Sequence, residues 1–220
     1  MPRRNTLLDA TWPYHVMSRS NNRESFYVPM EQCWNICTRF LKKGATEYGV
    51  HIHAFVLMPN HFHLMATTPN SNIGVFMRYV LTEISRGVQR ASGRTNHVFG
   101  SRYKWSWLPD PAAVAYVYKY ILRNPVRAQL AKLVEDYKFS SLRTSPLPIE
   151  TPEPEIWKNV PPSREGQWMW LNLATPMELE KLVQNALRRY SFAFSRSKTV
   201  RLQQKRLENF YLCERSSKSR

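Results

Sequence analysis

Hydrophobic side chains recur with helical spacing along parts of the chain. Residues 30–48 and residues 73–92 each place apolar positions three and four residues apart, a spacing that gives a helix one buried face. A third helix is predicted to begin at Asp110, an N-cap followed by a proline, and to run to about Asn124. Pro125 is expected to end it, because proline has no backbone N–H to donate in a helix interior.

Runs of β-branched and aromatic residues lie between these helices. The strand-like runs cover residues 14–19, 24–28, 50–57, 61–67 and 99–108. A Met-Pro-Asn turn joins the third and fourth runs into a hairpin. The order of strand, helix, hairpin, helix, strand and helix is typical of an α+β domain with a ferredoxin-like antiparallel sheet and packed helices.

The last third of the chain differs in composition. We expect one domain over residues 1–145, a Pro-rich linker over residues 146–174, and a helical, basic C-terminal extension over residues 175–220. A Thr-Pro pair opens the extension and suits the start of a helix. Ten basic residues stand against two acidic ones between residues 188 and 220. This tail is therefore predicted to act as an electrostatic arm.

The charge of the whole chain indicates a polyanionic partner. Its 220 residues include 32 Lys and Arg but only 16 Asp and Glu, which gives a formal charge of +16 and an isoelectric point near 10.1. Such an excess favours nucleic acid as the partner. The plain alternative is a basic protein whose charge only keeps it in solution. Hydrophobic residues make up 43% of the chain, which excludes wholesale disorder.

Cysteines and apolar runs narrow the expected location. Of three cysteines, Cys33 and Cys37 lie four residues apart on a predicted helix, without the spacing of a disulfide framework or a zinc knuckle. No apolar run approaches the roughly 18 residues of a membrane span, and no leader-like segment follows Met1. We therefore expect a protein of the reducing cytoplasm with no membrane partner.

His61 and His63 are the first candidates for chemistry. Side chains alternate across a strand, so the two imidazoles of a His-x-His pair stand on the same face and can hold a divalent cation with open positions for substrate and water. The alternative is a pair of strand histidines that bind nothing. His51 and His53 form a rival pair, but they lack the Pro-Asn lead-in, and His53 is interpreted as structural or near the site.

The third predicted helix supplies a possible partner for this pair. Tyr120 and Asn124 are four residues apart and therefore neighbours on one helix face. If that face meets the histidines, Asn124 can add an oxygen ligand to the cation and Tyr120 can lie beside a phosphate. A tyrosine is a poor nucleophile at neutral pH, so the chemistry requires a cation that activates it. Alternatively, Tyr116, Tyr118 and Tyr120 only pack and form hydrogen bonds.

Two motifs together resemble a known family. The segments "HAFVLMPNHFHLM" and "YILRNPVRA" are similar to those of single-tyrosine HUH transposases, most closely the REP-associated tyrosine transposases of bacteria, and the likeness runs from about Tyr14 to Ser141. The resemblance implies that His61 and His63 hold Mg²⁺ or Mn²⁺, with Asn124 completing the metal site. It also implies that Tyr120 attacks single-stranded DNA and forms a 5′-phosphotyrosine link.

The resemblance further implies a function and a partner. The expected protein is a metal-dependent single-stranded DNA endonuclease and strand transferase, associated with the bacterial nucleoid, that cleaves and rejoins DNA at palindromic hairpin repeats. A monomer is expected, while a dimer with shared active sites stays open. The alternatives are a non-catalytic nucleic-acid-binding protein on the same fold and a metal phosphodiesterase that uses water. The DNA contacts are expected at Arg19, Arg23, Arg102, Lys104, Trp105, Trp107 and Arg127. The alternatives are that the arginines are only solvated and that the two tryptophans belong to the core.

Overall fold

A four-stranded antiparallel sheet lies at the centre of the computed structural model, which describes residues 9–143 and 146–194. Its strands run in the order β2-β3-β1-β4. Their bounds are Tyr14–Arg19 for β1, His51–Met58 for β2, His61–Thr67 for β3 and Lys104–Trp107 for β4. The predicted α+β fold with an antiparallel sheet is confirmed.

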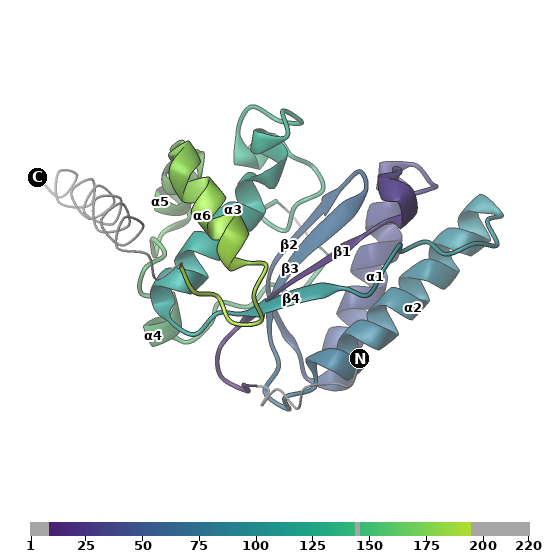
Figure 1. Cartoon of the computed structure of the whole chain (residues 1–220), viewed down its shortest axis with the longest axis horizontal. Coiled ribbons are helices and arrows are strands. Elements are labelled where there is room, and N and C mark those ends of the chain that lie inside the picture. The colour runs from purple at the N-terminus through teal and green to yellow at the C-terminus, as the bar shows by residue number, and fades with distance from the viewer. Residues whose placement is uncertain (1–8, 144–145, 195–220) are drawn as a thin grey trace, which may run out of the picture.

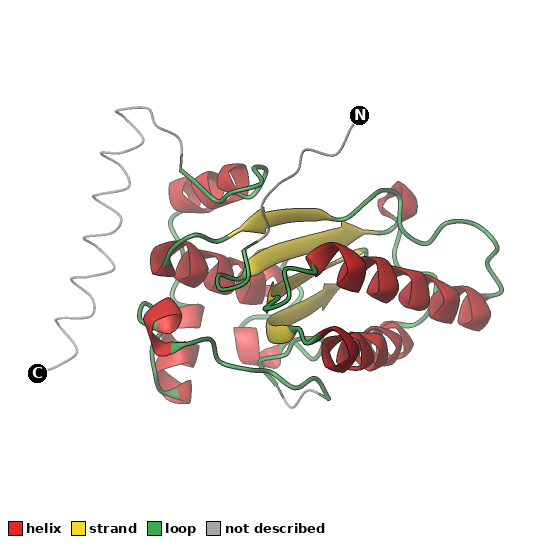
Figure 2. Cartoon of the chain, turned by 90° about the horizontal axis from the view of Figure 1, so that it is seen from below, coloured by secondary structure: helices red, strands yellow, loops and turns green. Residues whose placement is uncertain are grey.

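Helices cover both faces of this sheet (Figures 1 and 2). The helices α1 (Met30–Tyr48) and α2 (Ile73–Ser92) lie together on one face, and α3 (Pro111–Arg127) lies on the other. Two helices end as their sequences predict, since Gly49 and Gly93 follow α1 and α2 in the left-handed conformation that glycine adopts without a steric cost.

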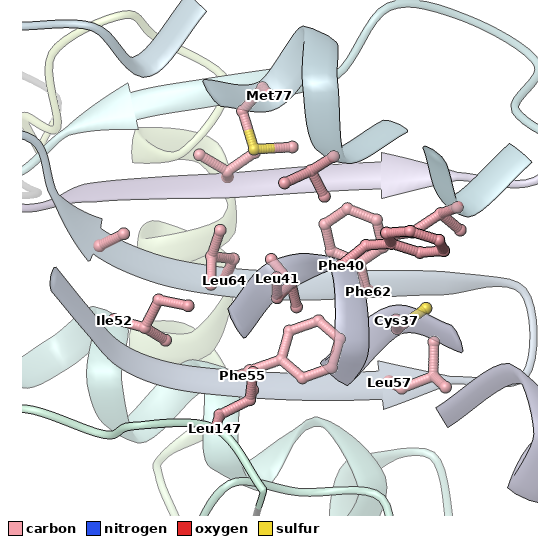
Figure 3. Close-up of a cluster of buried hydrophobic side chains, with 14 of the residues drawn as sticks. Cys37, Phe40, Leu41, Ile52, Phe55, Leu57, Phe62, Leu64, Met77 and Leu147 are labelled. Atoms are coloured by element: carbon pink, nitrogen blue, oxygen red, sulfur yellow. The ribbon is translucent and has the colours of Figure 1, made fainter. Parts of the chain in front are cut away.

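The core under α1 and α2 is the larger of two hydrophobic clusters. Phe55, Phe62 and Leu64 point from the strands toward Cys37 and Leu41 of α1 (Figure 3). All five side chains are fully buried. Because residues of β3 alternate between the two faces, burial of Phe62 and Leu64 in this core turns His61 and His63 toward α3.

The second cluster joins the opposite face of the sheet to α3. Val56 and Met65 from the sheet and Val117 and Ile121 from α3 are all fully buried there. Four such side chains, each removed from water, contribute on the order of 1.5–3 kcal/mol apiece. This packing fixes the position of α3 on β2 and β3, and with it the position of any side chain that α3 carries toward β3.

Both edges of the sheet are covered. Trp107 of β4 exchanges two backbone hydrogen bonds with residues 190–192, both with a donor to acceptor distance of 2.8 Å. On the other edge, β2 bonds to residues 139–141 and to Glu150. Covered edges leave few unpaired backbone groups that could pair with another chain.

The segment that the sequence predicts as a Pro-rich linker contains two short helices. They are α4 (Pro154–Trp157) and α5 (Arg164–Asn172), and both contact α3. Ile156 and Leu171 are buried in the second hydrophobic cluster. The helix α6 (Met177–Ala186) follows where a helix was predicted, while residues 195–220, which hold most of the basic tail, lie outside the described residues. The proposed domain boundaries stay a prediction.

Three local predictions about secondary structure are wrong. Residues 24–28 form no strand, and the last strand is limited to β4 rather than covering residues 99–108. The helix α3 does not end before Pro125 but continues through it to Arg127. A side chain supplies the donor that Pro125 lacks, because Nδ2 of Asn124 donates to the carbonyl of Ile121 at 3.4 Å and to that of Tyr120 at 2.8 Å.

Candidate active site

The two histidines of β3 lie side by side on the face that meets α3. Their ring centroids are 5.1 Å apart, and the ring planes are nearly perpendicular. His63 is buried, whereas His61 at the start of the strand is partly exposed. One edge of the pair is therefore open to a substrate. The shared face of the two histidines is the one that the alternation along β3 predicts.

Tyr120 of α3 contacts His63 of this pair. Its ring centroid lies 5.6 Å from that of His63, with the planes at 88°. The two residues are far apart in sequence, and packing of α3 on the sheet brings them together. The expected meeting of the His-x-His face with the tyrosine face of the third helix is thus present in the structure. Tyr118, two residues earlier, points instead into the contact with Trp157 and Trp170.

Asn124 lies one turn after Tyr120 and is buried. Its Nδ2 donates to the carbonyls of Tyr120 and Ile121, and its Oδ1 accepts a hydrogen bond of 2.6 Å from Nη2 of Arg127. A carbonyl oxygen has two lone pairs, so Oδ1 keeps the capacity for one further partner. Asn124 therefore has a structural role in the helix that sequence reasoning did not predict.

Replacing Asn124 by alanine is expected to lower the free energy of unfolding by about 1–3 kcal/mol, because two carbonyls and the Arg127 guanidinium each lose a buried partner. Urea denaturation of the purified variant measures this loss. The exposed helical residue Asn35 supplies a matched control, and Asn35→Ala is expected to change stability by less than about 0.5 kcal/mol. Equal effects of the two substitutions would refute the structural role.

Two arginines add positive charge beside the histidines. The guanidinium carbon of Arg127 lies 4.7 Å from the centre of the Tyr120 ring, and its Nη2 donates to the Tyr120 hydroxyl at 3.4 Å. Arg19 is the cross-strand partner of His61. Burial, and after it the charges of Arg19 and Arg127, lower the pKa of His61 to about 4. The site thus combines neutral imidazoles with cations that suit a phosphate.

A third histidine lies behind the pair. His15 of β1 is buried, and its Nε2 lies 2.9 Å from Nδ1 of His63 in a shared hydrogen bond. Burial lowers the pKa of His15 to about 3 and holds the pKa of His63 well below its ordinary value. His15 was not among the predicted site residues, since only the pairing register of β1 with β3 brings it to His63.

The rival pair has other partners. Nδ1 of His53 donates to the carbonyl of Glu150 at 2.6 Å, and its Nε2 lies 2.8 Å from the Thr67 hydroxyl. His51 pairs with the Glu150 carboxylate. A bulge between Ile52 and Ala54 interrupts the regular pairing of β2 with β3 at this point. His53 therefore fastens the segment around Glu150 to the sheet, and its two ring nitrogens are both occupied by protein groups.

Lowering the pH from 7 to 5 is expected to cost the fold about 2 kcal/mol at His53 alone. Burial lowers the pKa of His53 to about 4, against about 6.5 in the unfolded chain. Between these values the unfolded chain binds a proton that the folded chain does not, so stability is lost as the pH falls through this range. Urea denaturation at both pH values should show a smaller loss, by about 2 kcal/mol, in His53→Gln. An identical loss in the two proteins would contradict this.

The residues predicted to contact DNA do not all lie on the same face of the sheet. Lys104 pairs with Met17 across β1 and β4, which puts it on the face of the histidines. Arg19 and Arg127 adjoin the site as described, and Arg23 and Arg102 are exposed. Trp105 and Trp107 lie on the opposite face and pack against the core under α2; Trp105 also contacts the Tyr14 ring at 5.7 Å. Their role as stacking platforms stays a prediction.

A pocket between α3 and α6 is lined in part by Tyr120. Lys119, Arg123 and Arg127 line it together with Glu180. Nζ of Lys119 lies 5.2 Å from the centre of the Trp170 ring, and Nη1 of Arg123 donates to the carbonyl of Leu171 at 2.5 Å. These two cations hold α5 against α3. Part of the positive charge that lines the pocket is therefore already engaged in contacts between helices.

The donors at the histidine pair fit a divalent cation with open coordination positions. Among residues 9–143 and 146–194, no group of three or more His, Cys, Asp or Glu side chains is arranged to hold a metal ion. A cation at His61 and His63 would therefore take its remaining ligands from an amide oxygen, a phosphate or water. Such a site would leave coordination positions for water or substrate, as catalytic metal sites do.

The chain is similar to solved structures of other proteins. A structure described as a REP-associated tyrosine transposase bound to a REP hairpin has the same fold, with a TM-score of 0.52 and 20% identity over 64% of this chain and 82% of that one. A candidate transposase from Deinococcus radiodurans R1 matches with a TM-score of 0.38 and 17% identity, over 61% and 97% of the two chains. No curated protein matches significantly.

The family follows from the sequence model that matches residues 10–124, which is described as "Transposase IS200 like". This match covers more than half of the chain and includes β1 to β4, both histidines and Tyr120. The chain belongs to the IS200-like transposase family. Within the part of the chain that the structure describes, no helix is both long and apolar enough to cross a membrane.

Proposed function

We propose that the protein is a single-stranded DNA endonuclease and strand transferase that cleaves and rejoins DNA at palindromic hairpin repeats. The observation that carries the proposal is the contact of the Tyr120 ring with His63, which joins a nucleophile on α3 to an imidazole pair on β3. The solved relative that is described with a REP hairpin supports a hairpin as the partner. A monomer of the bacterial nucleoid is part of the same proposal.

Tyr120 is the proposed nucleophile. Its phenolic oxygen bonds to the phosphorus of the scissile phosphate as the bond from phosphorus to the 3′ oxygen breaks. The tyrosine proton passes to water, and the released 3′ oxygen takes a proton from water. The products are a 5′-phosphotyrosine and a free 3′-hydroxyl, so the phosphodiester energy is kept for rejoining when a 3′-hydroxyl attacks the phosphotyrosine. Arg127 holds the Tyr120 hydroxyl and places positive charge beside the oxygen that loses its proton.

His61, His63 and Asn124 are the proposed ligands of a divalent cation, Mg²⁺ or Mn²⁺. When bound, the cation would polarise the scissile phosphate. Lowered pKa values keep His61 and His63 neutral near pH 7, and this leaves each ring a lone pair to donate. Arg19 and Lys104 lie on the same face and are proposed to hold the flanking phosphates. Arg23, Arg102 and Trp105 are proposed as more distant DNA contacts.

Two other functions compete with this proposal. A phosphodiesterase on the same site would use water and would leave no protein–DNA bond. A non-catalytic DNA-binding protein would not need Tyr120 within reach of His63. The edge-on contact of these two rings, with Arg127 over the tyrosine, favours covalent chemistry over both alternatives.

A covalent adduct is the test that separates the three functions. The protein is incubated with Mn²⁺ and a 5′-unlabelled, 3′-labelled single strand that carries a hairpin, and the mixture is resolved under denaturing conditions. The proposal predicts labelled protein, because the 5′-phosphate end stays on Tyr120. Cleaved DNA without labelled protein would support the phosphodiesterase, and uncleaved DNA that shifts in a native gel would support the binding protein.

A further inference from the structure

His63 and His61 each use Nδ1 for a hydrogen bond within the protein. For His61 the partner is Oδ1 of Asn60, at 2.7 Å. For His63 it is Nε2 of His15, at 2.9 Å. Both bonds lie on the side of the ring away from Nε2. The two Nε2 atoms are therefore the ones that remain for a ligand, and their availability depends on where each ring carries its proton.

The tautomer of His61 follows from the orientation of Asn60. Nδ2 of Asn60 donates to the backbone carbonyl of Arg23 at 2.7 Å, and this turns Oδ1 toward His61. An amide oxygen only accepts, so Nδ1 of His61 must carry the hydrogen. Nε2 of a neutral His61 then has a free lone pair. The backbone of Asn60 is also held, because its main-chain carbonyl accepts a hydrogen bond of 2.9 Å from the backbone amide of Ser20.

The hydrogen bond between His15 and His63 contains one proton, because one of the two facing ring nitrogens must donate it and the other must accept it. If His63 donates, its Nε2 has a lone pair and can bind a cation. If His15 donates, Nε2 of His63 carries a hydrogen and cannot. His15 cannot itself be a ligand through Nε2, since that atom faces Nδ1 of His63. The His15 ring also restrains the orientation of His63, since the two ring centroids are 5.1 Å apart and the angle between the ring planes is 21°.

We propose that Asn60 and His15 are positioning residues that keep His61 and His63 protonated on Nδ1, so that both rings present Nε2 to a divalent cation. The proposal rests on the metal role that the proposed function gives these two histidines. Partners in the outer shell of a metal site set the tautomer and orientation of the ligands, and their loss weakens metal affinity about 10–100-fold.

Nuclear magnetic resonance of the metal-free protein tests the tautomers directly. Long-range proton to nitrogen correlations distinguish a protonated ring nitrogen from an unprotonated one, and the chain has only six histidines. We expect Nδ1–H at both His61 and His63, and an unprotonated Nε2 at His15. A wild-type spectrum with Nε2–H at His63 would overturn the inference before any variant is made.

Substitutions at His15 then test its effect on metal binding, with Mn²⁺ as the probe in calorimetry. His15→Leu removes the acceptor, and we expect His63 to move to Nε2–H and the dissociation constant for Mn²⁺ to rise about 10–100-fold. His15→Gln retains an acceptor oxygen and should bind Mn²⁺ within about threefold of wild type. His97→Leu, an exposed histidine change, serves as control. Nδ1–H and wild-type affinity in folded His15→Leu would refute the role of His15.

These measurements are independent of DNA cleavage. A wild-type protein with the expected tautomers that binds no Mn²⁺ would count against the proposed function and its metal site. The opposite tautomer with normal Mn²⁺ binding would count against the positioning residues alone. The wild-type spectrum also keeps the inference testable if His15→Leu does not fold.

Discussion

Tyr120→Phe is expected to form no covalent adduct with hairpin DNA and to lose strand cleavage by at least about 10³-fold, since removal of a catalytic nucleophile has effects of this size or larger. The phenylalanine ring keeps the edge-on contact with His63, so the fold should not change. Binding of uncleaved DNA should persist within a few-fold. Denaturing gels with 3′-labelled DNA measure the adduct, and native gels measure binding.

Tyr116→Phe is the matched control for this experiment. Tyr116 lies one turn before Tyr120 on α3, and its ring packs edge-on against Phe194 rather than against the histidines. The control should form adduct at a rate close to wild type. If adduct persists in Tyr120→Phe and disappears in Tyr116→Phe, the nucleophile has been assigned to the wrong residue.

His61→Ala should weaken Mn²⁺ binding by more than about 10²-fold, because loss of even an outer-shell partner costs about 10–100-fold and His61 is a proposed direct ligand. His61 suits the test better than His63, since its side chain is only partly buried and truncation leaves a smaller defect in the core. Calorimetric titration of the DNA-free protein measures the affinity. Adduct formation should fall in parallel, and raising the Mn²⁺ concentration should recover part of it.

His51→Ala controls for the loss of a strand histidine as such. His51 belongs to the rival pair, is about half exposed on its side chain, and pairs with Glu150 rather than with the site. Its Mn²⁺ affinity should stay within about twofold of wild type. Weaker Mn²⁺ binding in this variant than in His61→Ala would move the metal site to β2.

Periodicity alone located most of the elements. The ranges of α1, α2 and the β2–β3 hairpin follow from apolar spacing and from glycine or Pro-Asn signals, because these are local and each residue responds to its own neighbours. The prediction that the helix ends before Pro125 was wrong because the outcome depends on a particular side-chain contact and not on local preference alone. Continuation of α3 depends on the Asn124 amide, a contact that no propensity rule contains.

The candidate site divides in the same way. His61, His63, Tyr120 and Asn124 could be chosen from residue type and spacing, since alternation on a strand and the helical repeat decide which side chains share a face. His15 could not. Its contact with His63 is a diagonal one across β1 and β3, and a shift of the register by one residue would turn His15 to the other face.

The sequence by itself determined the fold class, the two imidazoles on one strand face and a tyrosine with an asparagine on one helix face. It also determined the charge of +16 that indicates a nucleic-acid partner. Only the tertiary structure decided that α3 packs with Tyr120 against His63 and that Arg127 lies over the tyrosine. The physical reason is that these contacts join residues distant along the chain, and burial of apolar surface between α3 and the sheet, rather than local preference, brings them together.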